Sequence, residues 1–453
     1  MKDPSPWQRR PLPDILPVEM FRRLLLAGLA GLTLVLAACG GGGGGEPMAS
    51  PTPAATATAT PLSVAVPTPP SEFAAYPDAI AAYLTETEGS SSCLAELFAA
   101  WDMPEPTFGP PCAAADLDGD GRDEYVVRIA DAATTGPPLG GTPPATAEAA
   151  SYGGDILILD DSGGGYEVVY RASVRGADTT PATGFLNPTI LGSDDYNDDG
   201  KAEAAFTGSE CGAHTCMTSV FVVGWDGSQY SDFFAEPVAQ PWTQPSEITF
   251  EDLDADGVQE IRVPAGTVSS VGAGPQRNSV LTYDWDGTSF VLTNTRHAAS
   301  DYLYFVVVDA DAAYAAGNPA SATSLYRKAA EDTSLKDWKE EIGARDRDEL
   351  VPYARFRLYL TQMTLLPTTD VDTALILVGS IEALAQEFPN SLHAQAAQRF
   401  GDAYRRQQTP QAGLTAACIA FTSFLEERRS EFDDAWDYGY ANPKPEPDQL
   451  CPQ

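Results

Sequence analysis

The chain reads Asp116-Leu117-Asp118-Gly119-Asp120-Gly121-Arg122-Asp123-Glu124 in its first half, and the spacing of its acidic residues recurs along the chain. The same pattern, D-x-[DN]-x-D-G-x-x-E, returns at Asp195–Glu203 and at Asp252–Glu260. Oxygen-bearing side chains stand at positions 1, 3, 5 and 9 of each stretch, and a glycine at position 6 lets the chain turn back. Hard cations such as Ca²⁺ prefer such oxygen ligands. The sequence therefore predicts three cation-binding loops.

The segments around these loops have the alternation of β-strands. From 105 to 297 glycine and proline are frequent, and short apolar segments with a period of two lie between turn residues. The turns of two later hairpins match each other, with an aromatic residue on each side, at Trp225–Tyr230 and at Trp285–Phe290. Each repeat thus has the make-up of four strands, as in a propeller blade. Residues 131–154 are expected to form a surface loop inserted in the first repeat.

The position of the last acid separates two families of calcium loop. An EF-hand places a bidentate glutamate at position 12 between helices, but position 12 is Val127, Phe206 or Val263 here, and the flanks are strands. The loops resemble the FG-GAP or VCBS repeat of integrin α-type propellers, whose last acid stands at position 9 of a hairpin. The family often has aspartate where this chain has glutamate.

The resemblance implies that about three Ca²⁺ ions bind to these loops. The residues implied as ligands, with the position-7 residues giving their carbonyl groups, are Asp116, Asp118, Asp120, Arg122 and Glu124; Asp195, Asn197, Asp199, Lys201 and Glu203; and Asp252, Asp254, Asp256, Val258 and Glu260. Three units are fewer than the typical 4 to 8 blades of a propeller. Closure could use the N-terminal helices, a further blade or a partner, and an open, sandwich-like domain is the alternative.

The N-terminus has the build of a bacterial export signal. Basic residues at 22–23 precede an apolar run from Leu24 to Ala38, and Leu36-Ala-Ala-Cys39 resembles a lipobox. We expect residues 1–38 to be a signal peptide, with Met20 as a candidate true start. Cys39 would carry the lipid, and residues 39–72, rich in Gly, Pro and Thr, would be a flexible tether. The mature protein would then be exported and lipid-anchored to the bacterial cell membrane.

Six cysteines remain after Cys39, an even number that fits an oxidising compartment. The pairings favoured among the fifteen connectivities are Cys93 with Cys112, Cys211 with Cys216, and Cys418 with Cys451. His214 lies between two of these cysteines, but with no fourth ligand nearby a stapled hairpin is favoured over a zinc site.

Helical periodicity appears on both sides of the β-region. Apolar residues at helical spacing predict short helices at 77–87 and 93–102, so residues 73–104 form a helical cap. In 298–453, small and aromatic residues such as Ala322, Tyr326, Phe400 and Phe421 resemble those of tetratricopeptide helical hairpins. A degenerate helix pair is expected at Tyr353–Leu365 and Asp372–Gln386, and an irregular helical bundle is the alternative. A multidomain α and β protein is therefore expected, in which an all-β propeller-like domain of about three four-stranded repeats precedes a tetratricopeptide-like α-helical hairpin array.

Charge and motifs limit the function classes. The formal net charge is −37, which makes nucleic acid a poor partner. Catalytic motifs such as H-E-x-x-H and G-x-S-x-G are not found in the sequence, and its three histidines are scattered. We expect a binding or scaffold module, with an unknown protein or glycan partner, rather than an enzyme. The alternatives are a hydrolase or lyase on a propeller scaffold and a purely structural envelope spacer.

Overall fold

The structure is a computed structural model, and its described residues all fall within Ser63–Gln453. It describes residues 64–89, 92–136, 151–172, 185–211, 215–270, 272–339, 346–367 and 369–451. The predicted signal peptide, the lipidation candidate Cys39, most of the predicted tether, His214 and much of the predicted insertion lie outside the described residues.

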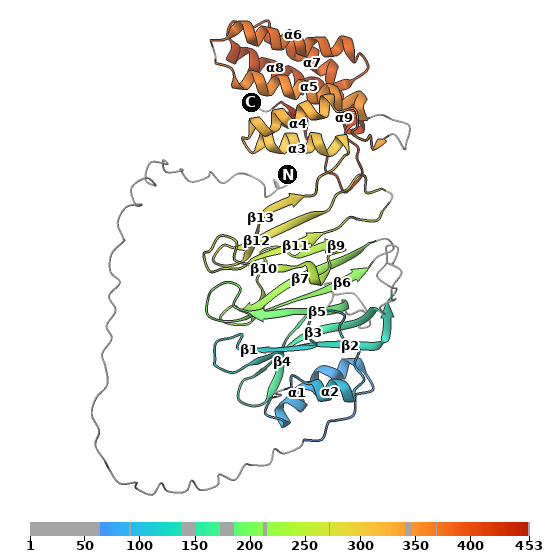
Figure 1. Ribbon diagram of the computed structural model, residues 1–453, viewed down its shortest axis with the longest axis vertical. Coiled ribbons are helices and arrows are strands. Elements are labelled where there is room, and N and C mark those ends of the chain that lie inside the picture. The colour runs from blue at the N-terminus through green and yellow to red at the C-terminus, as the bar shows by residue number, and fades with distance from the viewer. Residues whose placement is uncertain are drawn as a thin grey trace, which may run out of the picture. The chain divides into compact units, whose positions relative to one another are not determined.

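The chain folds into antiparallel sheets and helices, which confirms a mixed α and β protein (Figure 1). The first β-unit pairs in chain order; its strands are β1 (Cys112–Ala115), β2 (Glu124–Gly136), β3 (Ser151–Asp161) and β4 (Tyr166–Ala172). On β2 the side chains alternate, so that Tyr125 and Val127 face one side and Val126 faces the other. This unit is therefore apolar on both faces.

Two further units repeat the arrangement. The second comprises β5 (Phe185–Asp194), β6 (Glu203–Cys211), β7 (Cys216–Trp225) and β8 (Tyr230–Asp232), with β9 (Val238–Pro241) beside β7. The third comprises β10 (Thr249–Glu251), β11 (Glu260–Ala265), β12 (Ser279–Trp285) and β13 (Phe290–His297). A short contact between β3 and β5 joins the first two units into one nine-stranded sheet. In the described part of the chain the sheets close into neither a barrel nor a propeller.

The three units pack face to face through separate apolar cores. Val126 and Ile158 of the first unit share a core with Phe206 of the second. Val222, on the opposite face of the second unit, shares another core with Ile261 of the third. In Figure 1 the strands of successive units accordingly follow one another in chain order.

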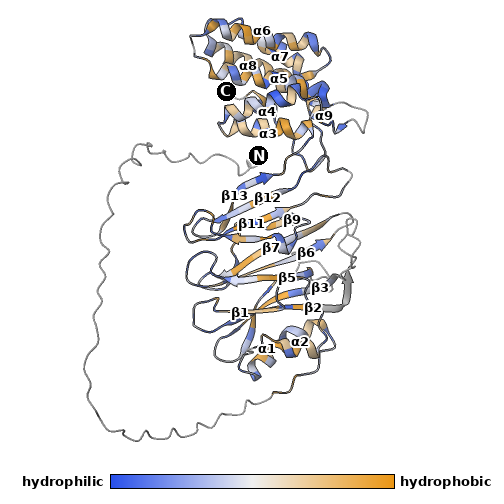
Figure 2. Ribbon diagram, viewed as in Figure 1, coloured by the Kyte–Doolittle hydropathy of each residue, from blue (hydrophilic) through white to orange (hydrophobic). Residues whose placement is uncertain are grey.

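The two ends of this stack differ in polarity. Helices α1 (Tyr76–Glu86) and α2 (Ala95–Ala100) cover the outer face of the first unit with apolar side chains. The outer face of the third unit carries one row of polar residues across its strands, Thr249, Arg262, Thr282 and Asn294. Figure 2 shows the hydrophilic character of β13. The apolar stacking therefore ends at the third unit.

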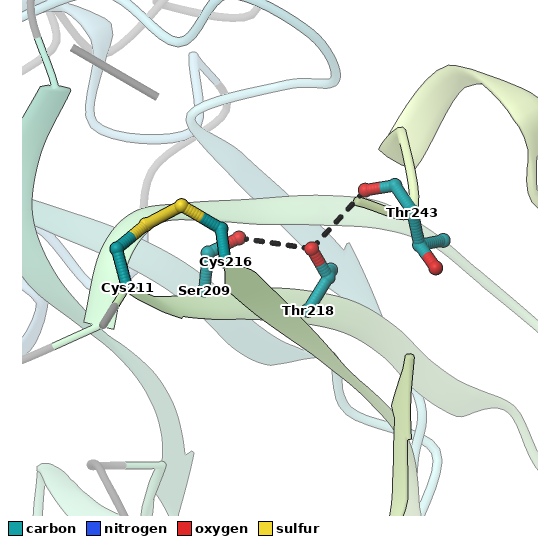
Figure 3. Close-up of a disulfide and its surroundings, with 5 residues drawn as sticks. All are labelled: Ser209, Cys211, Cys216, Thr218 and Thr243. Atoms are coloured by element: carbon teal, nitrogen blue, oxygen red, sulfur yellow. Dashed lines mark hydrogen bonds between the residues drawn. A yellow bond between two sulfur atoms is a disulfide. The ribbon is translucent and has the colours of Figure 1, made fainter. Parts of the chain in front are cut away.

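All three predicted disulfide pairings are confirmed, namely Cys93–Cys112, Cys211–Cys216 and Cys418–Cys451. The second of them closes the end of the β6–β7 hairpin (Figure 3). Beside it the Thr218 hydroxyl lies 3.1 Å from the Ser209 hydroxyl and donates to the Thr243 carbonyl at 3.1 Å. The Thr243 hydroxyl donates in turn to the carbonyl of Pro264 on β11. Polar side chains thus connect the second unit to the third.

The C-terminal region is helical. Its helices follow in chain order: α3 (Leu303–Ala315), α4 (Pro319–Glu331), α5 (Asp346–Leu365), α6 (Val371–Glu387), α7 (Leu392–Tyr404), α8 (Pro410–Glu427) and α9 (Arg429–Ala435). Small and aromatic residues of the predicted motif, such as Ala322, Tyr326, Phe400 and Phe421, are buried in one core. Neighbouring helices pack against each other in sequence from α3 to α8. A backbone bond from Tyr440 to Gly272 and the Arg277–Asp309 ion pair tie this region to the β-region.

Two helix starts differ from those expected. The helix expected from 93 begins at Ala95, because Cys93 and Leu94 have positive φ angles of 46° and 63°. The helix expected from Tyr353 begins at Asp346 and includes Pro352. In a sequence, proline suggests a helix boundary, but this helix tolerates it near its first turns.

Candidate metal-binding loops

The three acidic loops occupy equivalent places in the three β-units. Each connects the first strand of its unit to the second, between β1 and β2, between β5 and β6, and between β10 and β11. Because these strands pair as antiparallel hairpins, both ends of every loop are fixed by backbone hydrogen bonds. The hairpin context predicted from the sequence is present at all three positions.

The first loop is folded around its own carboxylates. Asp116 accepts the backbone N–H of Gly119 at 2.8 Å and that of Gly121 at 3.0 Å. Asp120 accepts the N–H of Arg122 at 2.8 Å. The Oε2 atom of Glu124 accepts the N–H of Leu117 at 2.5 Å, which closes the loop. The short side chains at positions 1 and 5 thus shape the turn, as aspartates commonly do.

The other two loops repeat these bonds. The acid at position 1 accepts the N–H of the glycine at position 6. Asp195 accepts the N–H of Gly200, and Asp252 accepts that of Gly257. The glutamate at position 9 accepts the N–H at position 2 through Oε2, with Glu203 at 2.9 Å and Glu260 at 2.6 Å. The position-7 residues Lys201 and Val258 donate their N–H to the position-5 carboxylate, as Arg122 does. The three loops therefore share one backbone geometry.

Two positions in each loop adopt the left-handed conformation. The glycine at position 6, predicted from the sequence, has φ of 90° at Gly121 and Gly200 and 102° at Gly257. Position 4 is also left-handed, and there the residue varies among Gly119, Asp198 and Ala255. The sequence did not reveal this second position, because only one of the three loops has glycine there.

Oxygen atoms converge inside each loop. In each group, atoms of all three residues lie within 4.8 Å of one another; the groups are Asp116, Asp118 and Glu124; Asp195, Asp199 and Glu203; and Asp252, Asp254 and Asp256. Asp120 is turned toward the Arg122 guanidinium, with which it forms an ion pair at 2.7 Å. The third group comprises aspartates only, and all three are exposed. Three acidic clusters that could hold metal ions are thus present.

Burial changes the chemistry of the glutamates at position 9. Glu124 is fully buried and Glu203 is 1% exposed. Burial raises the pKa of each to about 8, the backbone hydrogen bond at Oε2 opposes this shift, and neighbouring aspartates add to it. A cation bound beside either carboxylate would offset the cost of burying its charge.

One glutamate oxygen of the first loop is buried without a hydrogen-bond partner in the described part of the chain. The Oε1 atom of Glu124 is buried and has no hydrogen-bond partner among the described residues. In the second loop the corresponding oxygen of Glu203 accepts the amide of Asn197 at 3.1 Å. Buried oxygens without partners are uncommon in proteins, because nothing replaces the hydrogen bonds to water that they lose on burial. The residues at the first loop therefore fit a hard cation bound by oxygen atoms.

Neighbouring loops are joined by their backbones. Ala202 of the second loop donates its N–H to the carbonyl of Asp116 at 3.2 Å. Gln259 of the third loop donates to the carbonyl of Tyr196 at 2.9 Å, and its side chain donates to Asp194 at 3.2 Å. The loops thus form a continuous row along one edge of the stacked units. The sequence repeat alone could not place them side by side.

Two residues beside the first loop were not identified from the sequence. Asp160 of β3 has a raised pKa, because it is partly buried and lies close to the charges of Asp118 and Asp120. Tyr230 of β8 brings its hydroxyl close to Glu124. The first of these belongs to a β-strand of the same unit, whereas the second comes from the neighbouring unit. Only the packing of one unit on the next brings Tyr230 to this place.

The described histidines have structural surroundings. His393 is fully buried; its Nδ1 lies 2.7 Å from a Glu349 oxygen, and its Nε2 accepts the Trp436 indole N–H at 3.1 Å. His297 lies at the exposed end of β13. Within the described parts of residues 64–451, no helix has the length and apolar character needed to cross a bilayer.

Comparison of the chain with models of known protein families finds none that matches, and comparison with curated proteins finds no similar sequence. The functional interpretation therefore depends on the loops themselves and on the units that carry them.

Proposed function

We propose that this chain is a bacterial cell-envelope lipoprotein, attached through Cys39, that acts as a binding or scaffold module. Its β-units are FG-GAP/VCBS-like repeats of a propeller-like domain, and Ca²⁺ in their loops stabilises them. The helical region is a tetratricopeptide-like platform for a protein or glycan partner.

The observation that carries the proposal is the first loop. Three carboxylates converge there, and the buried Oε1 of Glu124 has no partner among the described residues. Calcium takes 6 to 8 oxygen ligands, and the loop offers several from a few consecutive residues. The repetition of the same backbone bonds in the other two loops supports about three ions, with Ca²⁺ favoured by the oxygen-only set of side chains.

The helical region supports the role as a platform. Its paired helices bury the small and aromatic residues of the tetratricopeptide-like pattern. Large apolar side chains near the start of α6 are exposed instead, with Val371 at 45%, Leu375 at 38% and Ile376 at 69%. Exposed apolar groups of this kind commonly mark surfaces that bind other proteins.

A pull-down from a bacterial envelope extract, with purified full-length chain as bait, tests the proposal. A selective protein or glycan should be retained in Ca²⁺ and lost in excess EDTA. The triple variant Glu124→Gln, Glu203→Gln and Glu260→Gln should behave in Ca²⁺ as the wild type does in EDTA. If the same set of molecules is retained under all conditions, or none is retained, the chain is not a calcium-supported binding module.

A further inference from the structure

Two buried polar side chains, one from each of two β-units, lie close together beside the first loop. The Oε1 atom of Glu124 and the hydroxyl of Tyr230 are both buried, and neither has a partner with good hydrogen-bond geometry among the described residues. Glu124 belongs to β2 and Tyr230 to β8. Leaving a buried polar group unpaired destabilises the folded protein. One of these groups is a donor and the other an acceptor, so each could serve as the partner of the other.

The surroundings hold the Tyr230 ring in this orientation. It packs against Trp225 across the β7–β8 hairpin, with ring centroids 5.2 Å apart. It also shares an apolar core with Leu117, whose N–H holds the other oxygen of Glu124. The Tyr230 hydroxyl lies close to the Glu124 carboxyl group, and a tyrosine hydroxyl can donate a hydrogen bond.

In the second loop, an amide donates to the glutamate oxygen that corresponds to Oε1 of Glu124. There the residue at position 3 is Asn197, whose amide donates to Oε1 of Glu203 at 3.1 Å. In the first loop position 3 is Asp118, whose side chain has no amide N–H to donate. The residue equivalent to Tyr230 in the third unit is Phe290, which shares a core with Tyr196 of the second loop and has no hydroxyl. The glutamate at position 9 thus has one nearby donor in each of these two loops. In the second loop the donor is the Asn197 amide, and in the first it is the Tyr230 hydroxyl.

We propose that Tyr230 is a positioning residue of the first cation site: when the ion is bound, its hydroxyl donates to Oε1 of Glu124 and holds this oxygen in place. The inference rests on the proposed function, since it assigns a role at one of the three calcium loops. A carboxylate oxygen can accept a hydrogen bond and bind a cation at once, and partners of this kind tune metal affinity about 10- to 100-fold. The first site is therefore built from two β-units.

Calorimetric titration of the metal-free, full-length chain with CaCl₂ tests this role. Tyr230→Phe should weaken one site about tenfold and the other sites by less. Its melting temperature without metal should not fall, because the substitution removes an unpaired hydroxyl. Tyr166→Phe is the matched control, since Tyr166 follows the β3–β4 turn as Tyr230 follows the β7–β8 turn, and it should bind as the wild type does.

The outcomes separate this inference from the proposed function. If the wild type binds about three ions and Tyr230→Phe binds them equally well, Tyr230 has no such role, while the calcium loops stand. An equal loss in Tyr166→Phe, or a lower melting temperature of metal-free Tyr230→Phe, would show a general packing effect and also overturn the inference. If the wild type binds no Ca²⁺, both proposals fall.

Discussion

The glutamates at position 9 combine two tasks within one carboxyl group. One oxygen of Glu124, Glu203 and Glu260 accepts the N–H at position 2 and so fixes the loop to the strand after it. In Glu124 and Glu203 the other oxygen remains for an ion, or for a donor such as the Asn197 amide. A glutamate is long enough to reach across the loop from the start of the second strand. The length of this side chain therefore allows one carboxyl group to serve both tasks.

The raised pKa values of Glu124 and Glu203 predict an unusual pH dependence. In the metal-free protein both rise from 4.5 to about 8, so between these values the folded chain binds more protons than the unfolded chain. The free energy of unfolding should therefore fall as pH rises through this window. Each pKa unit by which the folded and unfolded states differ corresponds to about 1.4 kcal/mol in the free energy of unfolding. Urea unfolding of metal-free protein at about pH 5 and about pH 8.5 measures the effect.

Calcium and one substitution serve as controls for this pH dependence. Saturating Ca²⁺ gives the ionised carboxylates a cationic partner, so the loss of stability toward high pH should disappear. Glu124→Gln should reduce the loss in metal-free protein, whereas Glu236→Gln, at an exposed position outside the loops, should not. Equal stability of the metal-free wild type at both pH values would contradict the prediction.

At the scale of elements, the loops could be predicted from sequence because their chemistry is local. The ligand spacing, the glycine at position 6 and the strand flanks lie within a few consecutive residues, and the structure keeps all three together. The disulfides could also be predicted, since each joins segments whose roles were already apparent. Tyr230 could not be found in this way, because its neighbour Glu124 lies in another unit and no local pattern connects them.

The row of loops predicts that ion binding at one site affects the next. Ala202 and Gln259 donate across the two loop boundaries, so ordering of one loop fixes the backbone of its neighbour. Glu203→Gln should abolish the middle site and weaken the other two about fivefold, which corresponds to about 1 kcal/mol of coupling. Glu210→Gln, at an exposed position of the same strand, is the control. Calorimetric titration showing unchanged outer sites in Glu203→Gln would mean that the loops act independently.

At the scale of the whole molecule, the sequence left the arrangement of the three units open. Four strands per unit could be counted from turns and alternation, but closure depends on which faces are apolar. The stack instead has α1 and α2 on one end and the polar row containing Thr249 and Arg262 on the other. Of the ways of closing considered from the sequence, the N-terminal helices do cover one end. The alternation of residues along a strand does not determine which element packs against each face of its sheet.

Metal removal should affect the β-region and spare the helical region. A site occupied at about ten times its dissociation constant adds roughly 1.4 kcal/mol, so three sites add about 4 kcal/mol. For a region of this size that corresponds to a shift in melting temperature of roughly 10 °C. Calorimetry of the full chain with Ca²⁺ and with EDTA should show this shift in the β-region. The helical transition serves as an internal reference, and an unchanged β-transition after confirmed metal removal would refute the role of the ions.

The polar outer face of the third unit also determines how such a protein could gain or lose repeats. The second unit is apolar on both faces, with Phe221 on one side and Val222 on the other. A duplicated copy of it would find an apolar neighbour on each side, so a longer protein could arise by tandem duplication there. A copy of the third unit placed after the original would meet Arg262 and Thr282 instead of an apolar surface. The third unit therefore ends the stack, and we expect the number of repeats to vary in the part of the chain that precedes it.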